Sequence, residues 1–343
     1  MPPSDPHDDA QQVMAANKAA VSRALNLVED RRPEAQTGVT KLLAELKDAP
    51  KAAGGHRVGL TGPPGVGKST LTSALARSVR QRGRTVGVVA IDPSSIRSGG
   101  SLLGDRARMS FDPSDEGLFV RSLATAGVVG GLAYAANSAV RVLAAAYDMV
   151  VIETTGVGQS EIDIVHVADT VVLVIQPGSG DVLQFLKAGI MEIPDILVVN
   201  KADHDELAQR AVSDLRGALQ TAHAVGAGSG QDVNWETPIL ATSATQGTGI
   251  EELIDTLDEH RQHLDATLAG RRRQGEAPRR GPVDPRPFQP QAWRARGFDP
   301  RWPSAAESPR RTRPRRRTNA VEPLRTLEPR VCNRARQDTV RNT

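Results

Sequence analysis

Cysteine, aromatic residues and long apolar runs are all scarce in this chain of 343 residues. The one cysteine, Cys332, can form no internal disulfide and no cysteine-paired metal cluster. Aromatic residues make up 3% of the sequence, which disfavours the stacking surfaces of proteins that bind single-stranded nucleic acid. No apolar run approaches the ~20 residues of a membrane span, and the polar first dozen residues lack the core of a signal peptide. We therefore expect a cytoplasmic protein with no membrane contact.

The net charge of +3 is unevenly distributed along the chain. From Arg271 onward we count about 20 arginines, no lysine and about 7 acidic residues, which leaves a net charge of roughly −10 for the part before it. An acidic body argues against a domain that binds nucleic acid specifically. The high isoelectric point therefore comes from the Arg/Pro-rich tail.

The most informative stretch is Gly62-Pro63-Pro64-Gly65-Val66-Gly67-Lys68-Ser69, which matches the P-loop pattern G-x-x-x-x-G-K-[ST]. It follows a short apolar run and opens a helical run, Leu71 to Arg80, and we expect the residues from Gly62 to Thr70 to bind the nucleotide. Backbone N–H groups of such a loop point at phosphate oxygens, and the helix N-terminus adds the positive end of its dipole. Lys68 can reach the β- and γ-phosphates, and the Ser69 hydroxyl can coordinate Mg²⁺. This segment predicts a nucleoside triphosphate site.

Periodicity divides the chain into three predicted parts. Helix-like spacing in residues 10–30 and 37–48 predicts an N-terminal helical extension, residues 1–50. Short apolar strands alternating with helices then predict an α/β P-loop NTPase domain, residues 51–270, with a mostly parallel central sheet flanked by helices. Its expected strands are residues 58–60, 86–91, 118–120, 149–152, 171–175, 196–199 and 238–241, and residues 250–268 form the expected closing helix. Frequent proline predicts that residues 271–343 are disordered.

Base selection is predicted from Asn200-Lys201-Ala202-Asp203, directly after an expected strand. In GTPases an N-K-x-D sequence recognises guanine, because the Asp carboxylate accepts two N–H bonds that adenine cannot offer. A wrong base would leave that charge unpaired. We expect Asn200 to brace the neighbouring loops and Lys201 to lie along the base. Ser243 and Ala244 follow the last expected strand, where the final guanine-contact loop of GTPases usually falls.

Three acidic residues are candidates for metal binding and catalysis. Glu153 ends an apolar strand and begins Glu153-Thr154-Thr155-Gly156, where GTPases usually carry D-x-x-G. Its longer carboxylate can reach Mg²⁺ through water or orient the attacking water, and Gly156 can offer an N–H to the γ-phosphate. Asp92 also ends a strand and leads into a glycine-rich loop suited to a nucleotide-dependent switch. Asp105, later in that loop, is the third candidate.

Together these residues resemble the MeaB/ArgK family of SIMIBI-class P-loop GTPases, over about residues 15 to 273. The most specific matches are Asp92-Pro93-Ser94-Ser95, the run from Gly99 to Met109, Glu153-Thr154-Thr155-Gly156-Val157-Gly158-Gln159-Ser160-Glu161, the run from Pro177 to Gln184, and Val199 to Asp203. The resemblance implies a GTP-dependent chaperone that gates cofactor loading of an adenosylcobalamin-dependent acyl-CoA mutase, chiefly methylmalonyl-CoA mutase. It also implies a cobalamin adenosyltransferase as a further candidate partner.

The resemblance assigns roles to individual residues. Lys68, Ser69, Asp92, Asp105 and Glu153 take the phosphate, Mg²⁺ and catalytic roles, with Ser69, Asp92 and Glu153 as the metal-side set. Asn200 and Asp203 take guanine recognition. The segments 159–163 and 178–187 are candidates for relaying GTP or GDP state to the mutase.

The sequence departs from the family at Ile96-Arg97, at Thr155 and in the tail. Family members normally continue after the last helix with helices that build a homodimer. Here an aperiodic, lysine-free tail stands in their place, so the sequence offers no basis for that homodimer. The composition is typical of a GC-rich gene read in a shifted frame, and we hypothesise a frameshift near Gln274. As written, the tail would be a disordered polycation.

Two other functions remain open from the residues alone. One is a metallochaperone GTPase of the hydrogenase or urease maturation type, although only 7 scattered histidines and one cysteine are present. The other is a transport-linked ATPase or kinase of the ArgK type, which Asn200 and Asp203 oppose because they favour guanine.

Overall fold

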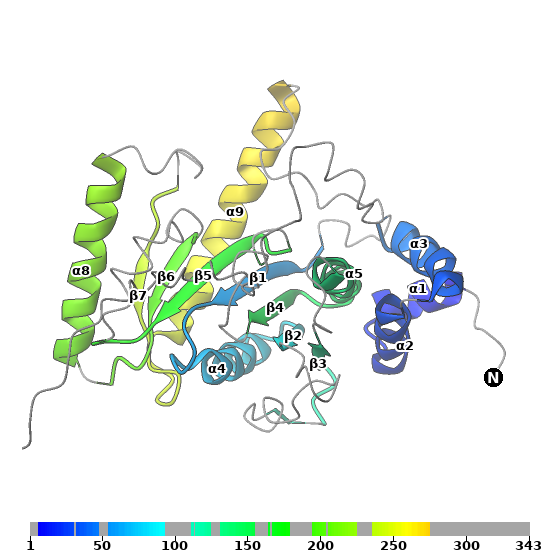
Figure 1. Ribbon diagram of the computed structural model, residues 1–343, viewed down its shortest axis with the longest axis horizontal. Coiled ribbons are helices and arrows are strands. Elements are labelled where there is room, and N and C mark those ends of the chain that lie inside the picture. The colour runs from blue at the N-terminus through cyan, green and yellow to red at the C-terminus, as the bar shows by residue number, and fades with distance from the viewer. Residues whose placement is uncertain are drawn as a thin grey trace, which may run out of the picture. The chain divides into compact units, whose positions relative to one another are not determined.

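The structure is a computed structural model that describes residues 6–30, 32–47, 54–92, 111–112, 114–124, 131–154, 164, 167–178, 194–203, 205–224 and 235–274 (Figure 1). Its centre is a sheet of seven parallel strands in the order β3-β2-β4-β1-β5-β6-β7. The strands are β1 (His56–Thr61), β2 (Val86–Asp92), β3 (Leu118–Ala124), β4 (Met149–Thr154), β5 (Thr170–Ile175), β6 (Ile196–Val199) and β7 (Ile239–Ala241). The predicted fold class is confirmed.

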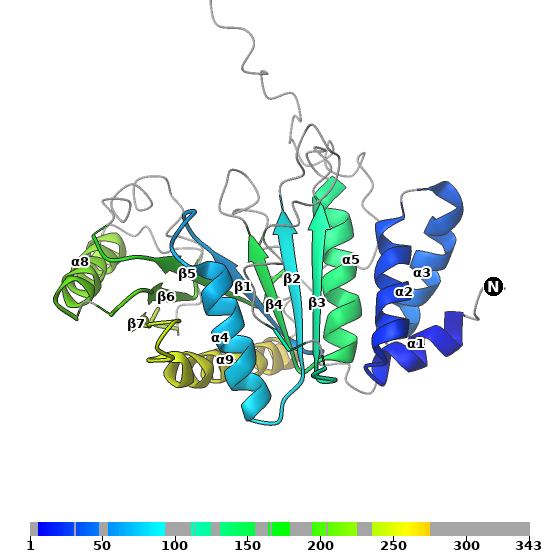
Figure 2. The ribbon, with the colours of Figure 1, turned by 90° about the horizontal axis from the view of Figure 1, so that it is seen from below.

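Helices cover both faces of this sheet (Figure 2). On one face lie α4 (Lys68–Gln81) and α9 (Ile250–Gln274), packed on alternate residues of the central strands. On the other lie α5 (Gly131–Ala146) and α8 (Asp205–Ala224). The strands β4, β5 and β6 are buried along their whole length, which explains why their sequences are almost continuously apolar.

Three helices precede the sheet, and they pack against α5 as Figure 2 shows. They are α1 (Pro6–Met14), α2 (Lys18–Glu29) and α3 (Pro33–Lys47). Residues 10–30, whose apolar spacing predicts helix throughout, are interrupted at Ala16, which has φ 56°. Asn17 then caps α2, because its side chain accepts a hydrogen bond from the N–H of Ala20 at 3.0 Å.

The seven expected strands all occur, most of them one or a few residues longer than predicted. The closing helix α9 runs six residues past its expected end, to Gln274. The tail from 275 and the predicted surface loop 225–234 lie outside the described residues. The division at residues 50 and 270 stays a prediction. Within the described parts of the chain, no helix has the length and apolarity to cross a membrane.

A buried polar cluster lies at the amino ends of the strands, the edge opposite the P-loop. The Thr170 hydroxyl bridges His56 Nε2 and His260 Nδ1, at 2.7 Å from each. Asp195 accepts a hydrogen bond from the N–H of Val171 at 2.8 Å, and its Oδ1 lies 3.7 Å from His260 Nε2. Burial lowers the pKa of His56 to about 3. The imidazole of His56 is therefore neutral at physiological pH.

Candidate nucleotide-binding site

The P-loop connects β1 to α4 at the carboxyl edge of the sheet, and glycine is required at its bends. Gly62, Gly65 and Gly67 have φ of 141°, 81° and 93°, values that other residues rarely adopt. A Cβ at Gly62 would collide with the carbonyl of Val174, and one at Gly67 would lie 2.6 Å from Asn200 Nδ2. The backbone therefore curls as the sequence motif predicts.

Lys68 is the first residue of α4, and its side chain turns back into the loop. Its Nζ donates hydrogen bonds to the carbonyls of Gly62 at 2.7 Å and Pro63 at 2.9 Å. The side chain is buried. A buried ammonium group at a helix N-terminus makes this end of α4 strongly electropositive, which suits an anionic ligand.

Glu153 lies against α4 at the end of β4, where two hydroxyl groups bind its carboxylate. The Ser69 hydroxyl donates to Oε1 at 2.5 Å, and the Thr72 hydroxyl donates to Oε2 at 3.1 Å. Glu153 is 5% exposed and Thr72 is fully buried. The structure thus places two predicted metal-side residues, Ser69 and Glu153, in direct contact.

Asn200 joins three loops. Its Nδ2 donates to the carbonyl of Val66 at 2.9 Å, while its Oδ1 accepts from the Thr242 hydroxyl at 3.2 Å and from the N–H of Ala244 at 3.3 Å. The side chain is 1% exposed, so all three bonds are shielded from water. The bracing that the sequence predicts for Asn200 is present, and it reaches both the P-loop and the loop after β7.

Lys201 and Asp203 complete the predicted base site. Lys201 has φ 59°, and its Nζ donates to the carbonyl of Gly65 at 2.6 Å and to Gln176 Oε1 at 2.7 Å. The Ser243 hydroxyl donates to Asp203 Oδ1. The loops after β5, β6 and β7 thus converge beside the P-loop, where open α/β sheets bind their ligands.

Some of the remaining predicted residues lie within the described residues and others lie outside them. Pro64 and Thr70 are exposed and Val66 is buried within the loop region. Asp92 is the last residue of β2, whose neighbour β4 ends in Glu153 and Thr154. Asp105, Gly156, the segment 159–163 and nearly all of 178–187 lie outside the described residues.

Sequence reasoning missed Thr72, Gln176 and Thr242, which contact Glu153, Lys201 and Asn200 respectively. Thr72 lies three residues after Ser69 on a helix, which is the one signal that it shares a face with Ser69. Gln176 and Thr242 each follow a strand end, at the edge where the motif residues gather.

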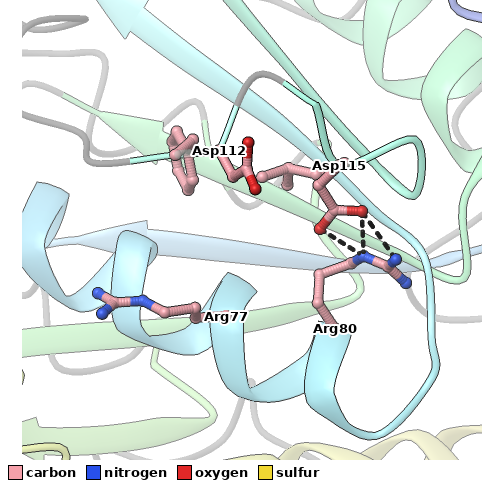
Figure 3. Close-up of a pocket in the computed structure, with 6 residues that line it drawn as sticks. Arg77, Arg80, Asp112 and Asp115 are labelled. Atoms are coloured by element: carbon pink, nitrogen blue, oxygen red, sulfur yellow. Dashed lines mark hydrogen bonds and ion pairs between the residues drawn. The ribbon is translucent and has the colours of Figure 1, made fainter.

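A separate hollow of about 530 Å³ lies between α4 and the turn before β3 (Figure 3). Arg80 holds Asp115 across it, with its Nε 2.9 Å from Oδ2 and its Nη2 2.8 Å from Oδ1. The other lining residues are Arg77, Phe111, Asp112 and Leu118. None of the motif residues lines this hollow, so the candidate nucleotide site is identified from the geometry of the loops.

The family model for the methylmalonyl Co-A mutase-associated GTPase MeaB matches residues 21–280, most of the chain. The chain belongs to this family. A Mycobacterium bovis protein named "Probable GTPase" is 41% identical over 267 residues, 75% of this chain and 77% of its own length. The mouse methylmalonic aciduria type A homolog, mitochondrial, is 35% identical over 274 residues, 76% of this chain and 64% of its own length.

A solved structure titled LAO/AO transport system kinase has the same fold. Its TM-score is 0.57 at 24% identity, and the match covers 80% of this chain and 85% of that one. With its family established, this MeaB-family chain is a GTPase that binds guanine nucleotide.

Proposed function

We propose that this GTPase acts in the cytoplasm as a GTP-dependent chaperone of an adenosylcobalamin-dependent acyl-CoA mutase, with methylmalonyl-CoA mutase as the first candidate. The observation that carries the proposal is the match of residues 21–280 to a family named for its association with that mutase. The name of the mouse relative, methylmalonic aciduria type A homolog, supports the same metabolic setting. A cobalamin adenosyltransferase is a further candidate partner.

The donor set on α4 and β4 fits Mg²⁺. This ion prefers hard oxygen ligands, and the Ser69 hydroxyl and the Glu153 carboxylate lie side by side at the end of the P-loop. Asp92 ends the strand next to β4 and would supply a further carboxylate. When bound, the ion would neutralise charge on the phosphates; these three residues would hold it.

Hydrolysis needs positioning and charge stabilisation more than covalent chemistry. A water oxygen forms a bond to the γ-phosphorus, and the bond to the bridging β–γ oxygen breaks with its electron pair remaining on GDP. The water protons pass to phosphate and solvent. We propose that Lys68 leaves its two carbonyl partners for the phosphates and that Glu153 orients the attacking water. Asp105 and Gly156 remain candidates at the γ-phosphate.

Guanine selection is assigned to Asp203, with Lys201 along the base and Asn200 fixing the loop. The bonds from Asn200 to the carbonyl of Val66 and from the N–H of Ala244 support this, because they tie the base-recognition loop to the phosphate loop. Ser243 orients the Asp203 carboxylate. Segments 159–163 and 178–187 follow the strands β4 and β5 and would relay nucleotide state to the mutase.

The proposal is tested by affinity capture with the full chain as bait, loaded with GDP or with a non-hydrolysable GTP analogue. We expect recovery of a cobalamin-dependent mutase to change severalfold between the two nucleotides. The variant Lys68→Ala, which should lose phosphate binding, serves as the control and should capture the same amount with either nucleotide. Recovery of no mutase, or of equal amounts from every sample, would contradict the chaperone function.

A further inference from the structure

Glu153 is bound by two hydroxyl groups from consecutive turns of one helix. Ser69 donates to Oε1 at 2.5 Å and Thr72 donates to Oε2 at 3.1 Å. The P-loop motif accounts for Ser69 but assigns nothing to Thr72. Because Thr72 is fully buried and Glu153 is 5% exposed, this contact is protected from competing water. A hydrogen bond to a buried carboxylate is stronger than one between neutral groups.

The Thr72 hydroxyl differs in its hydrogen bonding from two other helical hydroxyls, those of Ser73 and Thr256. Ser73 donates to the carbonyl of Ser69 at 3.0 Å, and Thr256 donates to that of Glu252 at 2.8 Å, both four residues back. That local bond is the usual choice of Ser and Thr inside a helix. Among the described residues, Thr72 makes no such bond to the backbone and donates to Glu153 instead. The hydroxyl is therefore directed at the carboxylate.

The length of Glu153 explains why a second donor matters. A glutamate side chain has one more rotatable bond than the aspartate usual at this position of GTPases. The hydrogen bond from Ser69 holds one carboxylate oxygen, and the hydrogen bond from Thr72 holds the other. With one donor on each oxygen, both the position and the plane of the carboxylate are fixed.

We propose that Thr72 is a positioning residue for GTP hydrolysis, which holds the Glu153 carboxylate in its orientation beside Ser69. The inference rests on the proposed role of Glu153 in hydrolysis. Thr72 lies one turn into α4, behind the P-loop, and acts through Glu153. It should therefore affect turnover and Mg²⁺ dependence, while leaving GDP affinity measured without Mg²⁺ unchanged.

The test compares Thr72→Val, which keeps the shape but removes the hydroxyl, with Thr72→Ser, which keeps the hydroxyl. We expect Thr72→Val to lower kcat for GTP about tenfold, with KM within about twofold, and Thr72→Ser to remain within about threefold of the parent. The Mg²⁺ concentration for half-maximal rate should rise for Thr72→Val alone. Thr256→Val, the same substitution at a buried position of α9, is the matched control and should retain parental kcat.

Glu153→Gln separates failure of this inference from failure of the proposed role of Glu153. If Glu153→Gln hydrolyses GTP with the parental kcat, Glu153 has no role in hydrolysis. If Glu153→Gln hydrolyses GTP slowly, two results would overturn the inference. One is that Thr72→Val keeps the parental kcat, and the other is that Thr256→Val loses as much kcat as Thr72→Val. The double variant Thr72→Val/Glu153→Gln should hydrolyse GTP no more slowly than Glu153→Gln alone, because Thr72 acts through Glu153. If Thr72→Val does not fold, Thr72→Ala takes its place in the comparison with Thr72→Ser. Equal kcat values in Thr72→Ala and Thr72→Ser would then count against the inference.

Discussion

At the scale of single residues, the proposed guanine selection depends on the Asp203 carboxylate, to which the Ser243 hydroxyl donates a hydrogen bond. Asp203→Asn replaces an acceptor for two N–H groups with one donor and one acceptor, a pattern that matches xanthine. We expect GTP affinity to fall on the order of 100-fold and XTP affinity to rise. Competitive nucleotide binding measures both. Asp214→Asn on the exposed side of α8 is the control, and unchanged GTP preference in Asp203→Asn would remove the guanine assignment.

The residues of the site were predictable where they belong to a continuous motif. The P-loop glycines occupy positions that backbone geometry reserves for glycine, and Lys68 and the N-K-x-D run belong to short motifs of fixed spacing. Thr72 could not be predicted in the same way, because its partner Glu153 is 81 residues away and the pairing depends on how α4 packs on β4. Gln176 is missed for the same reason, since its contact is with Lys201 from the next strand.

At the scale of elements, strands were easier to predict than the ends of helices. A strand buried on both faces is a short apolar run, and β4, β5 and β6 fit that description. The break between α1 and α2 was missed because apolar spacing continues through it. What ends the helix is the left-handed Ala16 and the cap at Asn17, which are local backbone features inside an alanine-rich stretch.

That cap can be tested directly. Asn17→Ala removes the acceptor for the N–H of Ala20 and should lower the free energy of unfolding by about 1 kcal/mol. Asn17→Asp keeps the acceptor and should stay within about 0.5 kcal/mol of the parent. Urea unfolding followed by circular dichroism measures both. Equal loss in the two variants would show that the side-chain bond does not stabilise α2.

At the scale of the whole molecule, the sheet separates the P-loop edge from an edge that buries the imidazole of His56. Burial lowers the pKa of His56 to about 3, against an ordinary value of 6.5. Nearby Arg261, His260 and Arg84 lower it further, while Asp169 opposes them. The unfolded chain therefore binds a proton at His56 that the folded chain does not. This contribution to stability is present above about pH 6.5 and is lost as the pH falls towards about 3.

The free energy of unfolding should consequently fall with acidification, with His56 contributing at most about 1.4 kcal/mol per pH unit in that window. His56→Gln removes the titrating ring and can still hydrogen-bond to Thr170, so its stability should decline less steeply with acidification. Urea unfolding of both proteins at pH 7.5, 6 and 5 gives the two slopes. The comparison isolates His56, because other titrating groups such as Asp169 are common to both proteins. Parallel slopes would mean that His56 becomes protonated within the folded protein at close to its ordinary pKa of 6.5, which would contradict its burial as a neutral ring.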